Sequence, residues 1–183
     1  PTQHQSTDYF NMKSRYRIAI SILACIFFVQ IGYSQKKISF GQVSMEELKM
    51  SVYSADSTAG AVILSDAGRL DGHTLRFTRH VRIKILSKSG LEWGNWIFNT
   101  PSEGEFDVLV FNLDGGRVVK EKASSSSIYN EEVVKGFEVY KVFAPNVKVG
   151  SVIDIKYSFY GIPFEWRFQE RIHVVFSELV LEQ

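Results

Sequence analysis

The sequence has little of three things that would point directly to a function: cysteine, charge of one sign, and long hydrophobic runs. Its 183 residues include one cysteine, which excludes an internal disulfide framework and any site built from several thiolates. The formal net charge is +1, so no broad electrostatic surface for nucleic acid or an anionic membrane is expected. With 45% hydrophobic and 14% aromatic residues, the chain nonetheless has enough apolar surface to fold, which argues against disorder.

The longest hydrophobic run, Ile18–Ile31, is shorter than the about 20 apolar residues that a membrane span needs. Three basic side chains at positions 13–17 precede it, and the small residues Gly32 and Ser34 follow it. A basic start, an apolar centre and a small-x-small exit are the three parts of a secretory signal peptide. Residues 12–34 are therefore predicted to be a signal peptide that is cut after Ser34.

This prediction places the mature chain, residues 35–183, outside the cytoplasm, which in a bacterium means the periplasm or the medium. Two alternatives keep it on the membrane: an uncleaved signal, or lipidation of Cys25, because Ile22–Cys25 loosely resembles a lipoprotein cleavage box. Residues 1–11 are polar, show no hydrophobic pattern and are expected to lie outside any domain.

The mature chain is predicted to be a single all-β domain. A capping box at Ser44–Glu47 predicts one short N-terminal helix, and Asp114–Gly116 predicts a tight hairpin turn. Roughly seven or eight short strands indicate an antiparallel β-sandwich, which the signal-peptide helix precedes. The first strand is expected at Ala61–Leu64, bounded by a turn at Asp66–Gly68. The others are expected at Leu75–Ile85, Phe106–Leu113, Arg117–Lys120, Phe137–Phe143 and Val152–Phe159, with a last strand pair or bend in Trp166–Phe176.

The mature segment carries no recognisable catalytic or cofactor motif. No cysteine follows position 34, no Gly-x-Ser-x-Gly elbow occurs, and the serines at 124–127 have no histidine nearby in sequence. His73, His80 and His173 are too sparse to predict a metal site, and no phosphate- or dinucleotide-binding motif is present. A serine hydrolase whose triad assembles only in space stays as a minor alternative.

Two features are candidates for binding. The predicted strand 75–85 would have a basic face, which could receive an anionic sugar or the acidic strand of a partner; its members are Arg76, His80, Arg82 and Lys84. The alternative is a solvated face, or ion pairs with acidic side chains on neighbouring strands. Trp93 and Trp96, with Trp166 later in the chain, could stack on sugar rings if they are exposed, or fill the core if they are buried.

Five segments, taken in order, resemble a known family. They are Phe40–Leu48, Arg79–Leu86, Phe111–Lys120, Ala144–Ile153 and Trp166–Gln169. Together they are similar to the β-rich domain of unknown function that precedes a transglutaminase-like, papain-like core in exported bacterial proteins. The resemblance covers about residues 38–180 and implies that the chemistry belongs to a following core built on Cys, His and Asp.

The sequence thus predicts a non-catalytic, exported accessory domain that supports, or presents substrate to, a transglutaminase-like core. That core is the expected partner, and because the sequence stops at Gln183 before such a core, the domain is expected to be truncated at its C-terminus. The alternative is a carbohydrate- or surface-binding module that uses Trp93 and Trp96. A glycan or a peptide is the expected ligand, with no metal, cofactor, nucleic acid or permanent membrane span.

Overall fold

The computed structural model describes residues 38–135 and 137–183, so the predicted signal peptide, Cys25 and residues 1–11 lie outside the described residues. The single α-helix among them is α2, Met45–Lys49. It begins with the predicted capping box: the Glu47 N–H donates to Ser44 Oγ at 3.1 Å, and the Ser44 N–H donates to the Glu47 carboxylate at 2.6 Å.

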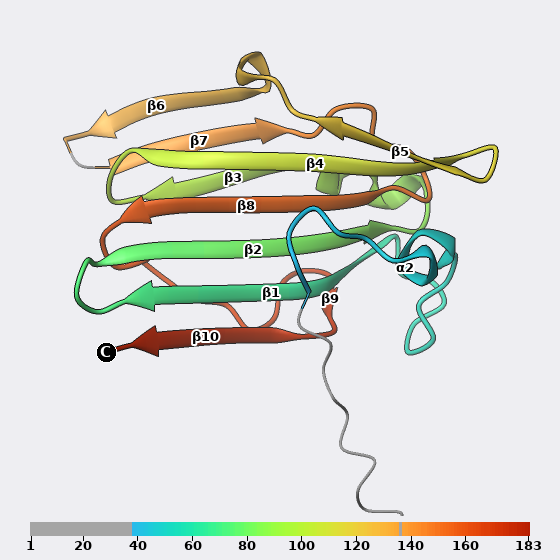
Figure 1. Ribbon diagram of the computed structural model, residues 1–183, viewed down its shortest axis with the longest axis horizontal. Helices are drawn as coiled ribbons and strands as arrows, with labels where there is room; N and C mark the ends of the chain where they lie inside the picture. Colours follow the sequence, from blue (N-terminus) through green and yellow to red (C-terminus); the bar gives the residue numbers. More distant parts are fainter. Residues whose placement is uncertain (1–37, 136) are drawn as a thin grey trace, which may run out of the picture. The chain divides into compact units, whose positions relative to one another are not determined.

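Two sheets make up the rest of the described chain (Figure 1). The larger sheet has the strand order β10-β1-β2-β8-β4-β5, with β9 also paired to β1. Its strands are β1 (Ala61–Asp71), β2 (Arg76–Ile85), β4 (Gly104–Asp114), β5 (Arg117–Lys122), β8 (Val152–Tyr160), β9 (His173–Val174) and β10 (Ser177–Glu182). The smaller sheet has the order β3-β7-β6, formed by β3 (Asn95–Thr100), β6 (Ile128–Val134) and β7 (Phe137–Phe143). Short 3₁₀ turns at Lys88–Gly94 and Ser125–Ser127 precede β3 and β6.

The inner faces of the two sheets pack together and form the main core. Ile83 and Ile155 of the larger sheet belong to one buried cluster with Phe98, Tyr140 and Val142 of the smaller sheet. The fold is therefore the predicted all-β sandwich with one short helix. One detail differs from a purely antiparallel arrangement, because β9 and β10 both run parallel to β1.

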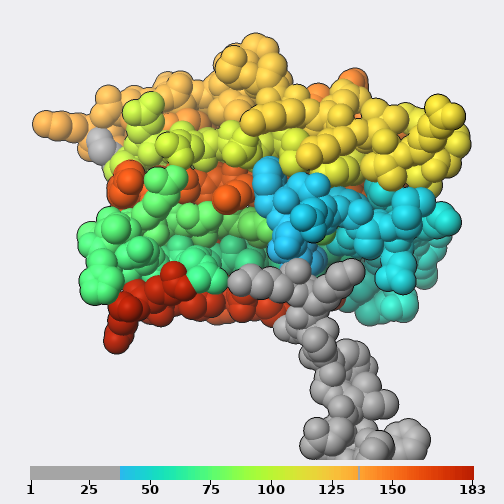
Figure 2. Space-filling model, viewed as in Figure 1, coloured from blue at the N-terminus to red at the C-terminus, as the bar shows by residue number. Residues whose placement is uncertain are grey.

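Residues 38–50, which include α2 and form the N-terminal segment, cover part of the outer face of the larger sheet. They are visible in blue in Figure 2. Leu48 of α2 is buried, and with Phe40 and Val43 it packs on Leu109 and Phe111. This second, smaller cluster explains why a face that alternation alone would expose to water is partly buried.

β1 is longer than the sequence predicted. The expected strand Ala61–Leu64 was bounded by a turn at Asp66–Gly68, and this prediction was wrong, because the strand continues to Asp71. A bulge between Ile63 and Ser65 shifts the register and reverses the alternation of side chains. Gly68 lies inside the strand because the ring of Trp166 packs directly against its backbone: an added Cβ would lie 2.4 Å from Trp166 Cζ3.

Three strands were missed, β3, β6 and β10, and the segment Trp166–Phe176 follows the alternative of a bend. β3 follows a two-residue pattern, with Phe98 and Thr100 buried and Ile97 exposed. It was not predicted as a strand, because Trp96 was interpreted only as a candidate for binding. β6 is almost entirely exposed and therefore shows no hydrophobic alternation. Within Trp166–Phe176 only the two-residue β9 is strand. The predicted hairpin turn is confirmed, with positive φ at Gly115 and Gly116 between β4 and β5.

Candidate functional site: an aromatic cleft beside β3

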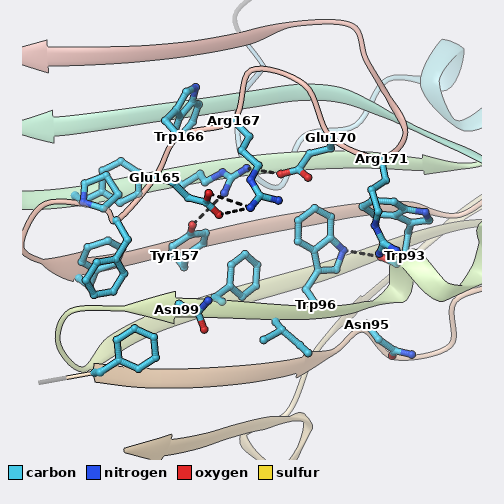
Figure 3. Close-up of a pocket in the computed structure, with 18 of the residues that line it drawn as sticks. Trp93, Asn95, Trp96, Asn99, Tyr157, Glu165, Trp166, Arg167, Glu170 and Arg171 are labelled. Atoms are coloured by element: carbon cyan, nitrogen blue, oxygen red, sulfur yellow. Dashed lines mark hydrogen bonds and ion pairs between the residues drawn. The ribbon is translucent and has the colours of Figure 1, made fainter. Parts of the chain in front are cut away.

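A cleft of about 530 Å³ lies between β3 and the segment Pro163–Arg171, with side chains of the larger sheet at its base (Figure 3). Its volume falls within the range of small-ligand and peptide pockets. The chain's three tryptophans all line it. Its other aromatic walls are Phe77, Phe98, Phe137, Tyr157, Phe159 and Phe164.

Trp93 and Trp96, predicted as binding candidates, lie in this cleft, and their rings are already in contact with protein. Trp96 Nε1 donates to the Trp93 carbonyl at 2.7 Å, and the two ring centroids are 5.6 Å apart. Trp96 also stacks on Phe98, with centroids 5.6 Å apart and planes 17° from parallel. The guanidinium of Arg171 lies 5.5 Å from the centroid of the Trp93 ring. Trp93 is only 9% exposed, so the pair forms a rigid wall.

An ion pair that sequence analysis missed lies at the base of the cleft. Arg79 of β2 donates to both carboxylate oxygens of Asp66, at 2.7 and 2.5 Å, and Asp66 is fully buried. The indole of Trp166 covers the guanidinium at 4.9 Å, and Glu170 lies 3.9 Å away. Burial opposes the charge on Arg79, but its hydrogen bonds to Asp66 raise its pKa above the ordinary value, so it stays charged. The sequence contained a sign of this buried ion pair: Arg79 lies between Phe77 and Val81 in the two-residue pattern, at a position where apolar side chains are expected.

The mouth of the cleft carries both signs of charge. Glu165 and Arg167 form an exposed ion pair at 2.8 Å, drawn at the centre of Figure 3. Trp166 Nε1 is buried and has no hydrogen-bond partner among the described residues. The charged lining residues balance: they are Arg79, Arg167, Arg171, Glu92, Glu165 and Glu170.

The predicted basic face does not exist as an exposed surface, and the expectation that Arg82 and Lys84 receive a ligand there was wrong. Arg82 is 1% exposed, and its Nε and NH2 atoms donate to Asp154 at 3.0 and 2.8 Å. Asp154 lies directly opposite on β8, so Arg82 follows the alternative of a cross-strand ion pair. Arg76, at the far end of the same strand, is partly exposed, and it pairs with Glu105 at 2.8 Å.

Lys84 is fully buried, and its ammonium group donates hydrogen bonds to backbone carbonyls. Its Nζ donates to the carbonyl of Leu48, in the last turn of α2, at 2.8 Å and to that of Gly150. Burial lowers the pKa of Lys84 to about 8. The two buried cations thus hold the N-terminal segment on the sheet, because Arg82 also reaches Glu47 of α2 and the Ser39 carbonyl.

The other residues considered in the sequence have local partners. His80 lies 2.5 Å from Asp154, and His173 lies 2.9 Å from Asp56. The Ser124 hydroxyl hydrogen-bonds to those of Ser126 and Ser127, at 2.7 and 3.2 Å. Among residues 38–135 and 137–183, no three acidic or histidine side chains lie close enough to hold a metal ion. No helix in that part of the chain is long and apolar enough to cross a membrane.

The comparison with solved structures finds distant likenesses. No protein-family model matches the sequence, and no curated protein matches it. A crystal structure described as a putative protease from Parabacteroides distasonis aligns over 57% of this chain, with 11% sequence identity and a TM-score of 0.44. The aligned part spans 23% of that protein's chain.

Proposed function

We propose that this domain is a non-catalytic, exported accessory module of a transglutaminase-like protein, and that the cleft beside β3 holds a polypeptide for the catalytic core. The observation that carries the proposal is the cleft of about 530 Å³, which combines aromatic walls with charged groups of both signs. The resemblance of the five segments to domains that precede such cores supports the accessory role and the export.

A polypeptide fits this cleft better than a sugar. Sugar rings need a free, flat aromatic face, whereas Trp96 is stacked on Phe98 and Arg171 lies over Trp93. A carbohydrate-binding module stays as the second candidate because all three tryptophans of the chain line one cleft.

A direct test is a fluorescence-anisotropy titration of the chain against dye-labelled, carboxymethylated α-lactalbumin, a polypeptide that cannot fold. We expect saturable binding that Trp96→Ala weakens at least tenfold. Tyr129→Ala is the matched control, because Tyr129 is an exposed aromatic residue on β6 that does not line the cleft.

The unfolding temperature of each variant separates lost binding from lost structure. Asn99→Arg provides a second cleft variant, since Asn99 is exposed and lines the cleft, so the substitution removes no core contact. Binding of cellohexaose, with no binding of the polypeptide, would favour the carbohydrate module instead.

The non-catalytic role has its own test. Incubation of the chain alone with the labelled polypeptide should release no fragment and form no cross-linked product on a denaturing gel. Product formation that persists in purified preparations and scales with chain concentration would contradict the proposal.

A further inference from the structure

The cleft exposes the unpaired edge of a β-strand. Among residues 38–135 and 137–183, β3 is the last strand of the smaller sheet, because the order β3-β7-β6 leaves it with a neighbour on one side only. The consecutive residues Asn95–Asn99 all line the cleft, together with Pro163–Arg167 opposite. Successive residues of a strand point to opposite faces of the sheet, and here the residues of both faces line the cleft. The edge of β3 therefore faces the cavity.

The hydrogen bonds between β3 and β7 show which backbone groups are free. The Ala144 N–H donates to the Gly94 carbonyl at 2.8 Å, and Asn95 lies opposite Phe143. In an antiparallel pair, alternate residues direct their N–H and C=O groups to the neighbour. The backbone N–H and C=O groups of the even-numbered residues of β3 therefore bond to β7. The backbone N–H and C=O groups of Ile97 and Asn99 point away from β7.

These outward groups have no partner in the described part of the chain. No hydrogen bond from residues 38–135 or 137–183 reaches the backbone N–H or C=O of Ile97 or Asn99. The N–H of Asn95 is used, since it donates to the Glu92 carbonyl. Unpaired strand edges of this kind are templates for pairing with another extended chain.

We propose that the cleft binds an extended segment of a partner polypeptide, which adds to β3 as a fourth strand of the smaller sheet. This rests on the proposed function and specifies its ligand: the backbone is recognised by the two N–H and two C=O groups of Ile97 and Asn99. The six residues of β3 span roughly 20 Å, enough for a strand of about four to six residues. Side chains pointing inward would meet the aromatic rings at the base of the cleft, and those pointing outward would meet solvent.

The geometry favours a partner's extended segment over a second folded copy. The edge of β3 lies in a cleft whose opposite wall is Pro163–Arg167, so an incoming strand must pass between two walls. An extended chain can do so, whereas the edge strand of another sandwich brings its neighbouring strands with it. The mixed charges of the cleft, with Glu92, Arg167, Glu170 and Arg171, suit a polypeptide that carries both signs.

The test uses proline at position 97. Because the Ile97 N–H points away from β7, Ile97→Pro removes the donor for the incoming strand and no bond within the sheet, and proline is tolerated on edge strands. Ile97→Ala is the matched control, since it removes the same side chain and keeps the N–H. For carboxymethylated α-lactalbumin we expect the Kd to rise at least tenfold with Ile97→Pro and less than threefold with Ile97→Ala.

Amide hydrogen exchange provides a second, independent measurement. Saturating probe should slow exchange at Ile97 and Asn99 at least tenfold and leave β5, an edge strand of the other sheet, unchanged. If the probe binds while these amides exchange as before and the proline and alanine variants bind alike, strand addition is wrong and the proposed function stands. If the probe does not bind at all, both fail.

Two outcomes would assign the edge to a different occupant and overturn the proposal. Protection of Ile97 and Asn99 in the free chain at every concentration would mean that another segment of the same chain already pairs with β3. Protection that grows with protein concentration, together with a dimer that Ile97→Pro dissociates, would mean that a second copy occupies the edge.

Discussion

At position 154 a fully buried carboxylate accepts hydrogen bonds from separate parts of the chain. Arg82 of β2 donates two, and the Gly41 N–H donates one at 2.7 Å. His80 completes the cluster at 2.5 Å. Asp154 therefore joins the N-terminal segment to the middle of the larger sheet.

Asp154→Asn should be strongly destabilising, because it removes the buried carboxylate that pairs with Arg82 and His80 and leaves the buried Arg82 guanidinium with the ion pair to the partly exposed Glu47. Breaking such a pair costs about 3–5 kcal/mol in the free energy of unfolding, which urea denaturation measures. Asp107→Asn is the control: Asp107 forms an exposed pair with Lys122 at 2.6 Å, and its loss should cost about 0–1 kcal/mol. Equal effects of the two substitutions would contradict the account of the cluster.

The same carboxylate should contribute to acid sensitivity. Burial alone would raise the pKa of Asp154, but hydrogen bonds from His80 and Arg82 outweigh it and lower the pKa. A lowered pKa in the folded state stabilises the fold above the unfolded value of about 3.9, and that stabilisation is lost as pH falls through the folded pKa. The stability difference between wild type and Asp154→Asn should thus narrow as the pH falls below about 4. A difference that widens below about pH 4 would refute this.

At the scale of an element, the segment that closes the cleft contacts β1 through a close approach of Trp166 to Gly68. The Trp166 ring lies between Gly68 and the Arg79 guanidinium, and a Cβ on Gly68 would also meet Leu179 of β10 at 3.0 Å. The segment's position therefore depends on the absence of a side chain at residue 68.

Gly68→Ala should cost about 1–3 kcal/mol through overpacking and change the near-ultraviolet circular dichroism as Trp166 moves. In the double variant with Trp166→Leu, the cost of Gly68→Ala should shrink, because the clash is relieved. Additive effects of the two substitutions in thermal unfolding would show that the contact does not hold the segment.

The β4–β5 hairpin gives a cleaner test of backbone conformation. Gly115 and Gly116 have φ of 55° and 81°, and an added Cβ would meet nothing within 4 Å at either position. Gly116→Val should cost about 1–2 kcal/mol from the left-handed conformation alone, whereas Gly115→Asn should be close to neutral, since asparagine suits this turn. Equal unfolding midpoints for the two variants would contradict the turn assignment.

The sequence predicted correctly those elements that depend on a few neighbouring residues. The capping box at Ser44, the Asp114–Gly116 turn and the strand Phe137–Phe143 follow from a few neighbouring residues, and the structure has all three. β6 could not be predicted, because an exposed edge strand is defined by its pairing with β7 and not by burial. The turn predicted at Asp66–Gly68 was wrong. Gly68 lies inside a strand, where the ring of Trp166, a residue distant in sequence, packs against its backbone and leaves no room for a side chain.

The candidate site was predictable only in part, for the same reason. Trp93 and Trp96 were singled out by residue type and do line the cleft. Arg82 and Lys84 were placed on an open face because the sequence does not show that α2 and its flanking segment fold back over that face. Asp66 was missed because the bulge in β1 changes which of its side chains face inward. Arg79 of β2 was missed although it lies between Phe77 and Val81, at an inward-facing position of the two-residue pattern.

At the scale of the whole domain, the two sheets differ in width, and the difference creates the cleft. The smaller sheet has three strands against the seven of the larger sheet, and the irregular segment from Gly161 to Ile172 lies over part of the remaining inner face. The cleft lies where the smaller sheet ends, so the cavity and the open edge of β3 have one structural origin.

The most direct test of the central claim is photocrosslinking from the cleft. The chain with Asn99→p-benzoylphenylalanine should crosslink to labelled, carboxymethylated α-lactalbumin on irradiation, and the chain with Val119→p-benzoylphenylalanine should not. Val119 is a partly exposed residue of β5, an edge strand of the larger sheet, and does not line the cleft. Crosslinks of equal yield from both positions, or from Val119 alone, would contradict the assignment of the cleft as the polypeptide-binding site.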